Sequence, residues 1–122
     1  HAHDAGFDLC CAETVELLPG ERKAISTGLQ IAIPAKHVGL VMDRSGNALN
    51  KGLHCLAGVI DAGYRGEWKI IMINLSQEKV LVEKGTRIAQ ALVLPLASVA
   101  FQEVQALDET ERATKGFGSS GH

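Results

Sequence analysis

Residues 58–68 read GVIDAGYRGEW, and an apolar run lies on each side of them, at 53–60 and 68–75. Asp61 ends the first run, and glycines at 63 and 66 bracket Tyr64 and its neighbouring arginine. Two apolar arms around such a turn predict a β-hairpin whose tight tip holds a carboxylate beside a phenol. Asp and Gly are also ordinary turn residues, so this stretch alone leaves a structural and a chemical role open.

Strand signals dominate the rest of the chain. Residues 46–52 can supply only a short helix, because Gly46 and Gly52 limit it. Many short strands between turns predict a single all-β domain, a sandwich or a barrel. We expect strands at 14–18, 23–33, 37–42, 53–60, 68–75, 80–82, 87–94 and 97–104.

The composition is that of an ordinary globular protein of one domain. The 122 residues are 46% hydrophobic and 21% charged, and the formal net charge is −2 with both signs scattered along the chain. Without a basic stripe, binding to a long nucleic acid is not expected, although a few local cations can still hold one nucleotide. No apolar stretch approaches the roughly 20 residues of a membrane span.

The cysteines point to a reducing compartment. Cys10, Cys11 and Cys55 are odd in number and two of them are adjacent, which makes a poor disulfide framework. Their spacing does not match a zinc site. We therefore expect a cytoplasmic protein.

Three further segments place polar side chains beside apolar runs. Asp8, in Ala5–Leu9, is either a buried structural carboxylate or a residue that positions a metal-bound water. Arg44-Ser45-Gly46 begins a turn and suits an anion, or else Arg44 is simply exposed in a loop. Gln90 lies at the mouth of an expected strand and carries little information alone.

The C-terminal segment differs in composition. After Asp108 the chain becomes polar, and it ends with Gly116-Phe117-Gly118-Ser119-Ser120-Gly121 before the last histidine. Such a segment cannot bury enough surface to stay ordered alone. It is either a floppy tail or an arm that orders over a ligand, with Phe117 stacked on a ring and glycine amides and serine hydroxyls on phosphate oxygens.

These segments, taken in order, resemble the five motifs of the trimeric dUTP diphosphatases (dUTPases). The resemblance covers nearly the whole chain and implies a distorted jelly-roll-like β-barrel or sandwich. It also implies a division into a β domain, residues 1–111, and a flexible arm, residues 112–122, that closes over the active site. The matching segments are Ala5–Leu9, Arg44–Ala48, Gly58–Gly66, Arg87–Gln90 and Arg112 with Gly116–Gly121.

The resemblance implies hydrolysis of dUTP to dUMP and pyrophosphate, which removes dUTP from the nucleotide pool and supplies dUMP. Asp61 would be the general base for the attacking water. Tyr64 would pack under the sugar and exclude a 2′-hydroxyl, while backbone groups of Cys55 to Gly58 would read uracil. The substrate contacts implied in this region are Cys55, Gly58, Val59, Ile60, Tyr64 and Lys69.

The same resemblance assigns the triphosphate, a metal and an oligomer. Mg²⁺ would span the phosphate oxygens, and Asp8 would help place it through water. Three chains would share each site, which implies a homotrimer. The triphosphate contacts would come from Arg44, Ser45, Gly46 and Gln90, and the arm would add Phe117 over uracil with Arg112, Gly118, Ser119 and Ser120 near the phosphates.

Three departures from the family pattern and two rival functions complete the prediction. Gly63 replaces a frequent second acid, Ala113 and Lys115 stand at common glycine positions, and Asp43 stands where Pro or Ala is more usual. The related dCTP deaminases need a Glu in the strand after the hairpin, and Lys69–Met72 contains no acid, which argues against deamination. A dUTPase-like regulatory or binding protein is the other alternative.

Overall fold

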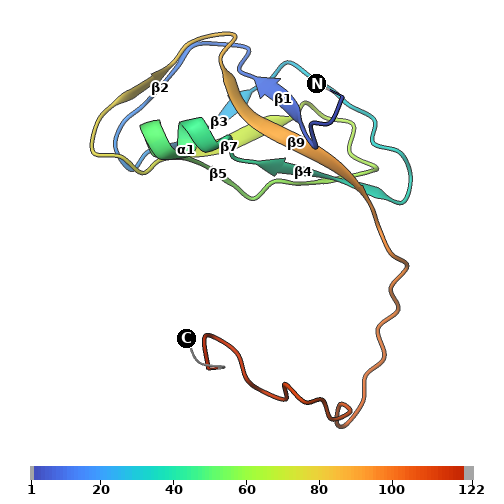
Figure 1. Ribbon diagram of the computed structural model, residues 1–122. Coiled ribbons are helices and arrows are strands. Elements are labelled where there is room, and N and C mark those ends of the chain that lie inside the picture. Colours follow the sequence, from blue (N-terminus) through green and yellow to red (C-terminus); the bar gives the residue numbers. More distant parts are fainter. Residues whose placement is uncertain (1, 120–122) are drawn as a thin grey trace.

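A computed structural model of the chain describes residues 2–119, which form a β body with a long C-terminal segment leading away from it (Figure 1). Nine strands build three antiparallel sheets within these residues, so the all-β prediction is confirmed. The four-stranded sheet has the order β1 (Phe7–Cys10), β9 (Arg87–Pro95), β4 (His37–Met42), β6 (Val59–Asp61). The other two sheets are β3 (Arg22–Ser26), β7 (Lys69–Asn74), β5 (Leu53–Leu56), and the pair β2 (Val15–Leu17), β8 (Val80–Val82).

Side chains from all three sheets meet in one apolar core. Trp68, just before β7, is fully buried and is the largest of the side chains in it. Gly39 in β4 lies so close that a Cβ there would come within 3.2 Å of the Trp68 ring and 2.6 Å of the Ile33 side chain. This close packing joins the four-stranded sheet to the start of β7 in the three-stranded sheet.

The segment 53–60, predicted as one strand of a hairpin, forms two strands. The prediction of a simple hairpin is therefore wrong. β5 does pair with β7, with Leu56 opposite Ile71, whereas β6 crosses to β4, with Asp61 opposite Val38. The change of sheet occurs at Ala57 and Gly58, whose φ angles are 61° and 109°. The backbone is left-handed at both residues, and a Cβ on Gly58 would lie 2.7 Å from the Val41 carbonyl oxygen.

Two other strand predictions are wrong, and β1 was not among the predicted strands. Residues 27–33 do not continue β3, because Gly28 turns the chain with a φ of 70°. Residues 97–104 form no strand, because they lie exposed and have no neighbouring strand in the described part of this chain to complete their hydrogen bonds.

Helix α1 (Ser45–Lys51) is the short helix that the sequence predicts, and it is wholly on the surface. It buries no residue, and Gly52 ends it in the left-handed conformation with a φ of 66°. Asn47 links it to β9 by donating to the Arg87 carbonyl at 3.0 Å. No helix in residues 2–119 is long and apolar enough to cross a membrane.

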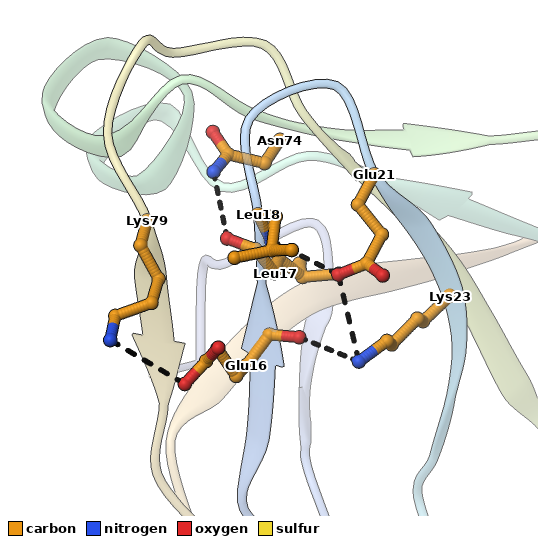
Figure 2. Close-up of polar contacts among 7 residues, drawn as sticks. All are labelled: Glu16, Leu17, Leu18, Glu21, Lys23, Asn74 and Lys79. Atoms are coloured by element: carbon orange, nitrogen blue, oxygen red, sulfur yellow. Dashed lines mark hydrogen bonds and ion pairs between the residues drawn. The ribbon is translucent and has the colours of Figure 1, made fainter.

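Asn74, at the end of β7, is a fully buried polar residue with every side-chain group satisfied. Its Nδ2 donates to the carbonyl of Leu17 at 3.0 Å and to that of Glu78 at 2.7 Å. Its Oδ1 accepts from the backbone N–H and hydroxyl of Ser76 at 2.9 and 2.7 Å. Figure 2 shows the bond to Leu17, with the exposed Lys79–Glu16 ion pair (3.6 Å) nearby.

Candidate functional site

The first part of the site is a polar cavity of about 450 Å³ between β1, β9 and the start of α1. Asp8 in β1 lies directly opposite Gln90 in β9, and Arg44 stands at the N-cap position of α1. Three segments of the sequence thus meet at one place. The residues that line this cavity are Asp4, Asp8, Arg44, Ser45, Gly46, Arg87 and Gln90.

Two guanidinium groups share the carboxylate of Asp8 in this cavity. Arg44 forms an ion pair with Oδ1, and the Nε of Arg87 lies 3.6 Å from Oδ2. Arginines are well suited to phosphate, because their planar donors match its oxygens. We call Asp8, Arg44, Ser45, Gly46, Arg87 and Gln90 the anion pocket.

Sequence reasoning missed Arg87. Arg87 belongs to the same short motif as Gln90, but its position gives no hint of which way it points. The contact with Asp8 arises because the pairing of β1 with β9 shifts register between Leu9 and Cys10, where Cys10 comes to lie opposite Arg87. A register shift of this kind is a property of the folded sheet.

Asp43, which directly precedes Arg44, bonds the loop of the anion pocket to β5. Its Oδ1 accepts the backbone N–H of Cys55 at 2.6 Å, and its Oδ2 lies 2.6 Å from Nδ1 of His54. Burial acts to raise the pKa of Asp43, but the hydrogen bonds from His54 and Cys55 and the charge of His54 hold that pKa below its usual value.

Cys55, predicted among the residues that read the base, has its backbone N–H occupied. Its N–H is already bonded to Asp43, so the Cys55 amide is not available to read a base. Burial, followed by the hydrogen bond and the charge of Asp43, raises the pKa of the Cys55 thiol to about 12. The thiol therefore stays protonated at neutral pH and is no nucleophile.

The second part of the site is a groove along β6. A cavity of about 260 Å³ holds Asp61 and Tyr64, and one of about 190 Å³ surrounds the Ala57–Gly58 bend. The two cavities share Val59, Ile60 and Lys69 and therefore lie next to each other. The other lining residues are Glu67 in the first, and Val41, Leu56, Ile70 and Ile71 in the second.

Hydrogen bonds hold Tyr64 at its backbone N–H and at its side-chain hydroxyl. Its N–H donates to the Asp61 carbonyl at 3.1 Å, and its hydroxyl donates to the Glu67 carbonyl at 2.9 Å. Gly66 leaves room for the ring, since a Cβ there would lie 2.5 Å from the Tyr64 hydroxyl. The exposed carboxylate of Asp61 and the phenol ring thus line one cavity, as the sequence predicts.

Glu67, which the sequence analysis did not single out, anchors this loop to the opposite strand. Its Oε2 accepts from the hydroxyl of Ser26 and from the N–H of Gly28, the latter at 2.8 Å. The Ser26 hydrogen bond, the Gly28 hydrogen bond and the charge of Lys69 lower the pKa of Glu67. The Glu67 carboxylate therefore holds structure and is not free to move protons.

Asp61 and the anion pocket lie near opposite ends of β4. Asp61 is opposite Val38, and Arg44 comes six residues after Val38, two residues past the end of β4. At about 3.3 Å per residue of extended chain, this separation is about 20 Å. The Ala57–Gly58 end of the groove lies closer to the pocket, since the Gly58 carbonyl accepts the Val41 N–H at 2.8 Å. One chain therefore keeps Asp61 apart from its own anion pocket.

Among the described residues 2–119, the predicted arm residues join neither the anion pocket nor the β6 groove. From Leu96 onward the segment leads away from the β body (Figure 1), and the Phe117 side chain is fully exposed. Arg112 donates from Nε to the Lys115 carbonyl within the segment, at 2.8 Å. Gly118 and Ser119 are also exposed, and Ser120 lies outside the described residues.

Comparison with known proteins identifies the family. The family model described as dUTPase matches residues 1–121. This chain belongs to the dUTPase family. The deoxyuridine 5′-triphosphate nucleotidohydrolase of Clostridium kluyveri is 49% identical to it, over 99% of this chain and 86% of the relative.

Solved dUTPase structures share the fold. The dUTPase of Staphylococcus bacteriophage 80alpha with dUpNHpp has a TM-score of 0.89 and 35% identity, and the match covers 100% of this chain and 89% of that chain. A mutant dUTPase from phage phi11 of S. aureus, described with a structural Mg(II) ion, has a TM-score of 0.83 and 27% identity, with 89% and 88% covered. The predicted jelly-roll-like all-β fold of the dUTPases is thereby confirmed.

Proposed function

We propose that this chain hydrolyses dUTP to dUMP and pyrophosphate. The observation that carries the proposal is the β6 groove, in which Asp61 and Tyr64 line one end and the Ala57–Gly58 bend lines the other. A nucleotide needs adjoining binding positions for its base, its sugar and its α-phosphate, and the groove offers such positions. Membership of the dUTPase family and relatives such as the C. kluyveri nucleotidohydrolase support the same reaction.

Uracil occupies the apolar end of the groove in this proposal. Backbone groups of residues 56–58 other than the Gly58 carbonyl face the base, because the left-handed bend ends the pairing of β5. The Gly58 carbonyl already accepts the Val41 N–H at 2.8 Å. Fixed backbone donors and acceptors discriminate between bases more strongly than apolar contact does. Deoxyribose lies on the ring of Tyr64, where a 2′-hydroxyl meets the phenol.

Asp61 acts as the general base. Its carboxylate takes a proton from a water molecule while the water oxygen attacks the α-phosphorus. The bond from the α-phosphorus to the bridging oxygen breaks, and pyrophosphate leaves with the electron pair. Because the Asp61 carbonyl and the Tyr64 N–H share a hydrogen bond, the base and the sugar platform keep a constant relative position.

The anion pocket holds the triphosphate. Arg44 and Arg87 exchange the carboxylate of Asp8 for phosphate oxygens, and Ser45, Gly46 and the amide of Gln90 add donors. The guanidinium charge stabilises the negative charge that gathers on the leaving pyrophosphate.

The residues of the pocket also fit Mg²⁺ that arrives with the nucleotide. No group of three or more His, Cys, Asp or Glu in residues 2–119 is placed to hold a metal by itself. Mg²⁺ commonly uses one or two carboxylates with substrate phosphates and water, and Asp8 would supply such a contact through water. The ion would neutralise charge on the phosphate oxygens.

The separation of about 20 Å between Asp61 and Arg44 of one chain supports a site shared between chains. A water molecule must lie about 3–3.5 Å from the phosphorus that it attacks, so Asp61 and Arg44 of the same chain cannot serve one triphosphate. We propose a homotrimer in which Asp61 of one chain works with the anion pocket of another. The arm, 112–122, closes the site with Phe117 over uracil and its other residues near the phosphates.

A reducing compartment such as the cytoplasm suits this enzyme. The three cysteines in the described part of the chain are all free thiols, and two of them are buried.

A pyrophosphate-release assay tests the reaction. We expect release from dUTP, and far slower release from UTP, dCTP and dTTP, because sugar and base contacts reject them. Absence of release from dUTP would contradict the proposed function. Ammonia formed from dCTP would favour the deaminase, although β7 (Lys69–Asn74) offers no acid for that reaction.

Mixing two impaired variants tests the shared site. Asp61→Asn and Arg44→Gln subunits, refolded together in equal amounts, should recover about one quarter of wild-type activity, because random trimers restore an intact pair at about one site in four. The control combines the same variants as preformed trimers without exchange. Recovery no greater than in that control would show that each chain supplies a complete site.

A further inference from the structure

Asp43 makes three contacts that join segments far apart in the sequence. Its carboxylate accepts from the N–H of Cys55 and lies against His54, each at 2.6 Å. Its backbone carbonyl accepts from Nε2 of Gln90 at 2.8 Å. It directly precedes Arg44, the first residue of the anion pocket along this loop.

Other contacts support the loop that Asp43 anchors from different directions. Arg44 pairs with Asp8 of β1, and Asn47 of helix α1 bonds to β9 beyond Ser45 and Gly46. Helix α1 itself buries no side chain, and Arg44 makes no side-chain capping bond to it. The carboxylate of Asp43 is the side-chain contact that fixes the start of the pocket to β5.

Asp43 is not itself in a position to bind the nucleotide. It is absent from the lining of the polar cavity, and both its carboxylate oxygens face residues of β5. The lowered pKa of this carboxyl agrees with an ionised group held by its neighbours. Its two neighbours in the pocket, Arg44 and Gln90, do face the cavity.

We propose that Asp43 is a positioning residue for the triphosphate: by bonding to β5 and to Gln90, it holds Arg44 and the Gln90 amide in the geometry that grips the phosphates. This inference rests on the proposed function, because it concerns the triphosphate half of the same site. It also gives a role to Asp43, one of the departures from the family pattern that the sequence resembles.

If only the charge of Asp43 mattered, its removal would have the opposite effect on triphosphate binding. A carboxylate close to a triphosphate repels it, so removal of the charge alone would tighten binding. Loss of the anchor would weaken binding, because Arg44 and Gln90 would sample other positions. The two explanations therefore differ in sign.

The test compares Asp43→Ala with Asp43→Asn. Alanine removes the charge and the anchor, whereas asparagine removes the charge and keeps an oxygen for the Cys55 N–H and an amide toward His54. The probes are dUpNHpp, which needs both halves of the site, and dUMP, which uses mainly the β6 groove. Because these are binding measurements, turnover does not enter them.

We expect Asp43→Ala to raise the Kd of dUpNHpp about tenfold or more, as loss of a charge-assisted hydrogen bond implies. The Kd of dUMP should change less than about twofold, and KM for dUTP should rise with little change in kcat. Asp43→Asn should restore most of the affinity. Glu16→Ala, which removes an exposed carboxylate near Lys79 (Figure 2), is the matched control and should change neither Kd.

Tighter or unchanged dUpNHpp binding by Asp43→Ala would overturn the inference, and so would equal weakening of dUpNHpp and dUMP. If Asp43→Ala does not fold, His54→Ala replaces it, since it removes one anchor and leaves the Cys55 bond; it should weaken dUpNHpp selectively, and no effect would count against the inference. Wild-type protein that binds neither probe would instead contradict the proposed function.

Discussion

Replacing Asp61 with asparagine is expected to abolish dUTP hydrolysis while leaving nucleotide binding nearly intact. Asparagine has the same shape but cannot accept the proton of the attacking water, and a positioned general base contributes roughly 10²- to 10⁴-fold. The bond between Asp61 and the Tyr64 N–H uses the backbone carbonyl, which the substitution keeps. The measurement is kcat for dUTP together with the Kd of dUpNHpp.

Asp108→Asn is the control for that experiment. It removes an exposed carboxylate outside both the anion pocket and the β6 groove, and it should leave kcat unchanged. If Asp61→Asn instead weakens binding as much as it slows turnover, Asp61 supports the groove and another group activates water. A rate close to that of the wild type would also exclude Asp61 as the base.

Replacing Asn74 with alanine should cost about 3–5 kcal/mol of stability, since it strands several buried polar groups and leaves a cavity. The carbonyls of Leu17 and Glu78 would lose the Nδ2 donor, and Ser76 would lose its acceptor. A typical domain is stable by only about 5–15 kcal/mol. The measurement is urea unfolding at one fixed protein concentration, because association adds to apparent stability.

The neighbouring Glu16–Lys79 pair provides the comparison for Asn74 (Figure 2). Both partners are about half exposed, so Glu16→Ala should cost at most about 1 kcal/mol. Asn74→Ala and Glu16→Ala with equal effects would mean that the buried network around Asn74 contributes no more than a surface pair. The larger loss of stability expected for Asn74→Ala follows from burial, since water cannot replace the lost hydrogen bonds.

Local patterns predicted most of the strands and several site residues. The apolar run 37–42 coincides with β4 in the structure. Asp61 and Tyr64 line one cavity, because a short turn joins them whatever the rest of the chain does. The run 97–104 shows where such reasoning fails, because a strand needs a partner, and none of the described strands lies beside it.

The sequence by itself determined the all-β class and the local turn at Asp61 and Tyr64, because alternation and turn chemistry act between near neighbours. It also determined the family, through five short motifs in order. Only the tertiary structure decided that β6 leaves the sheet of β5 at Ala57–Gly58, and that Asp8, Arg44, Arg87 and Gln90 converge. It also placed Asp61 about 20 Å along the chain direction of β4 from Arg44 in the anion pocket of its own chain. Strand register and long-range pairing set these relations, and neither depends on residues close together in the sequence.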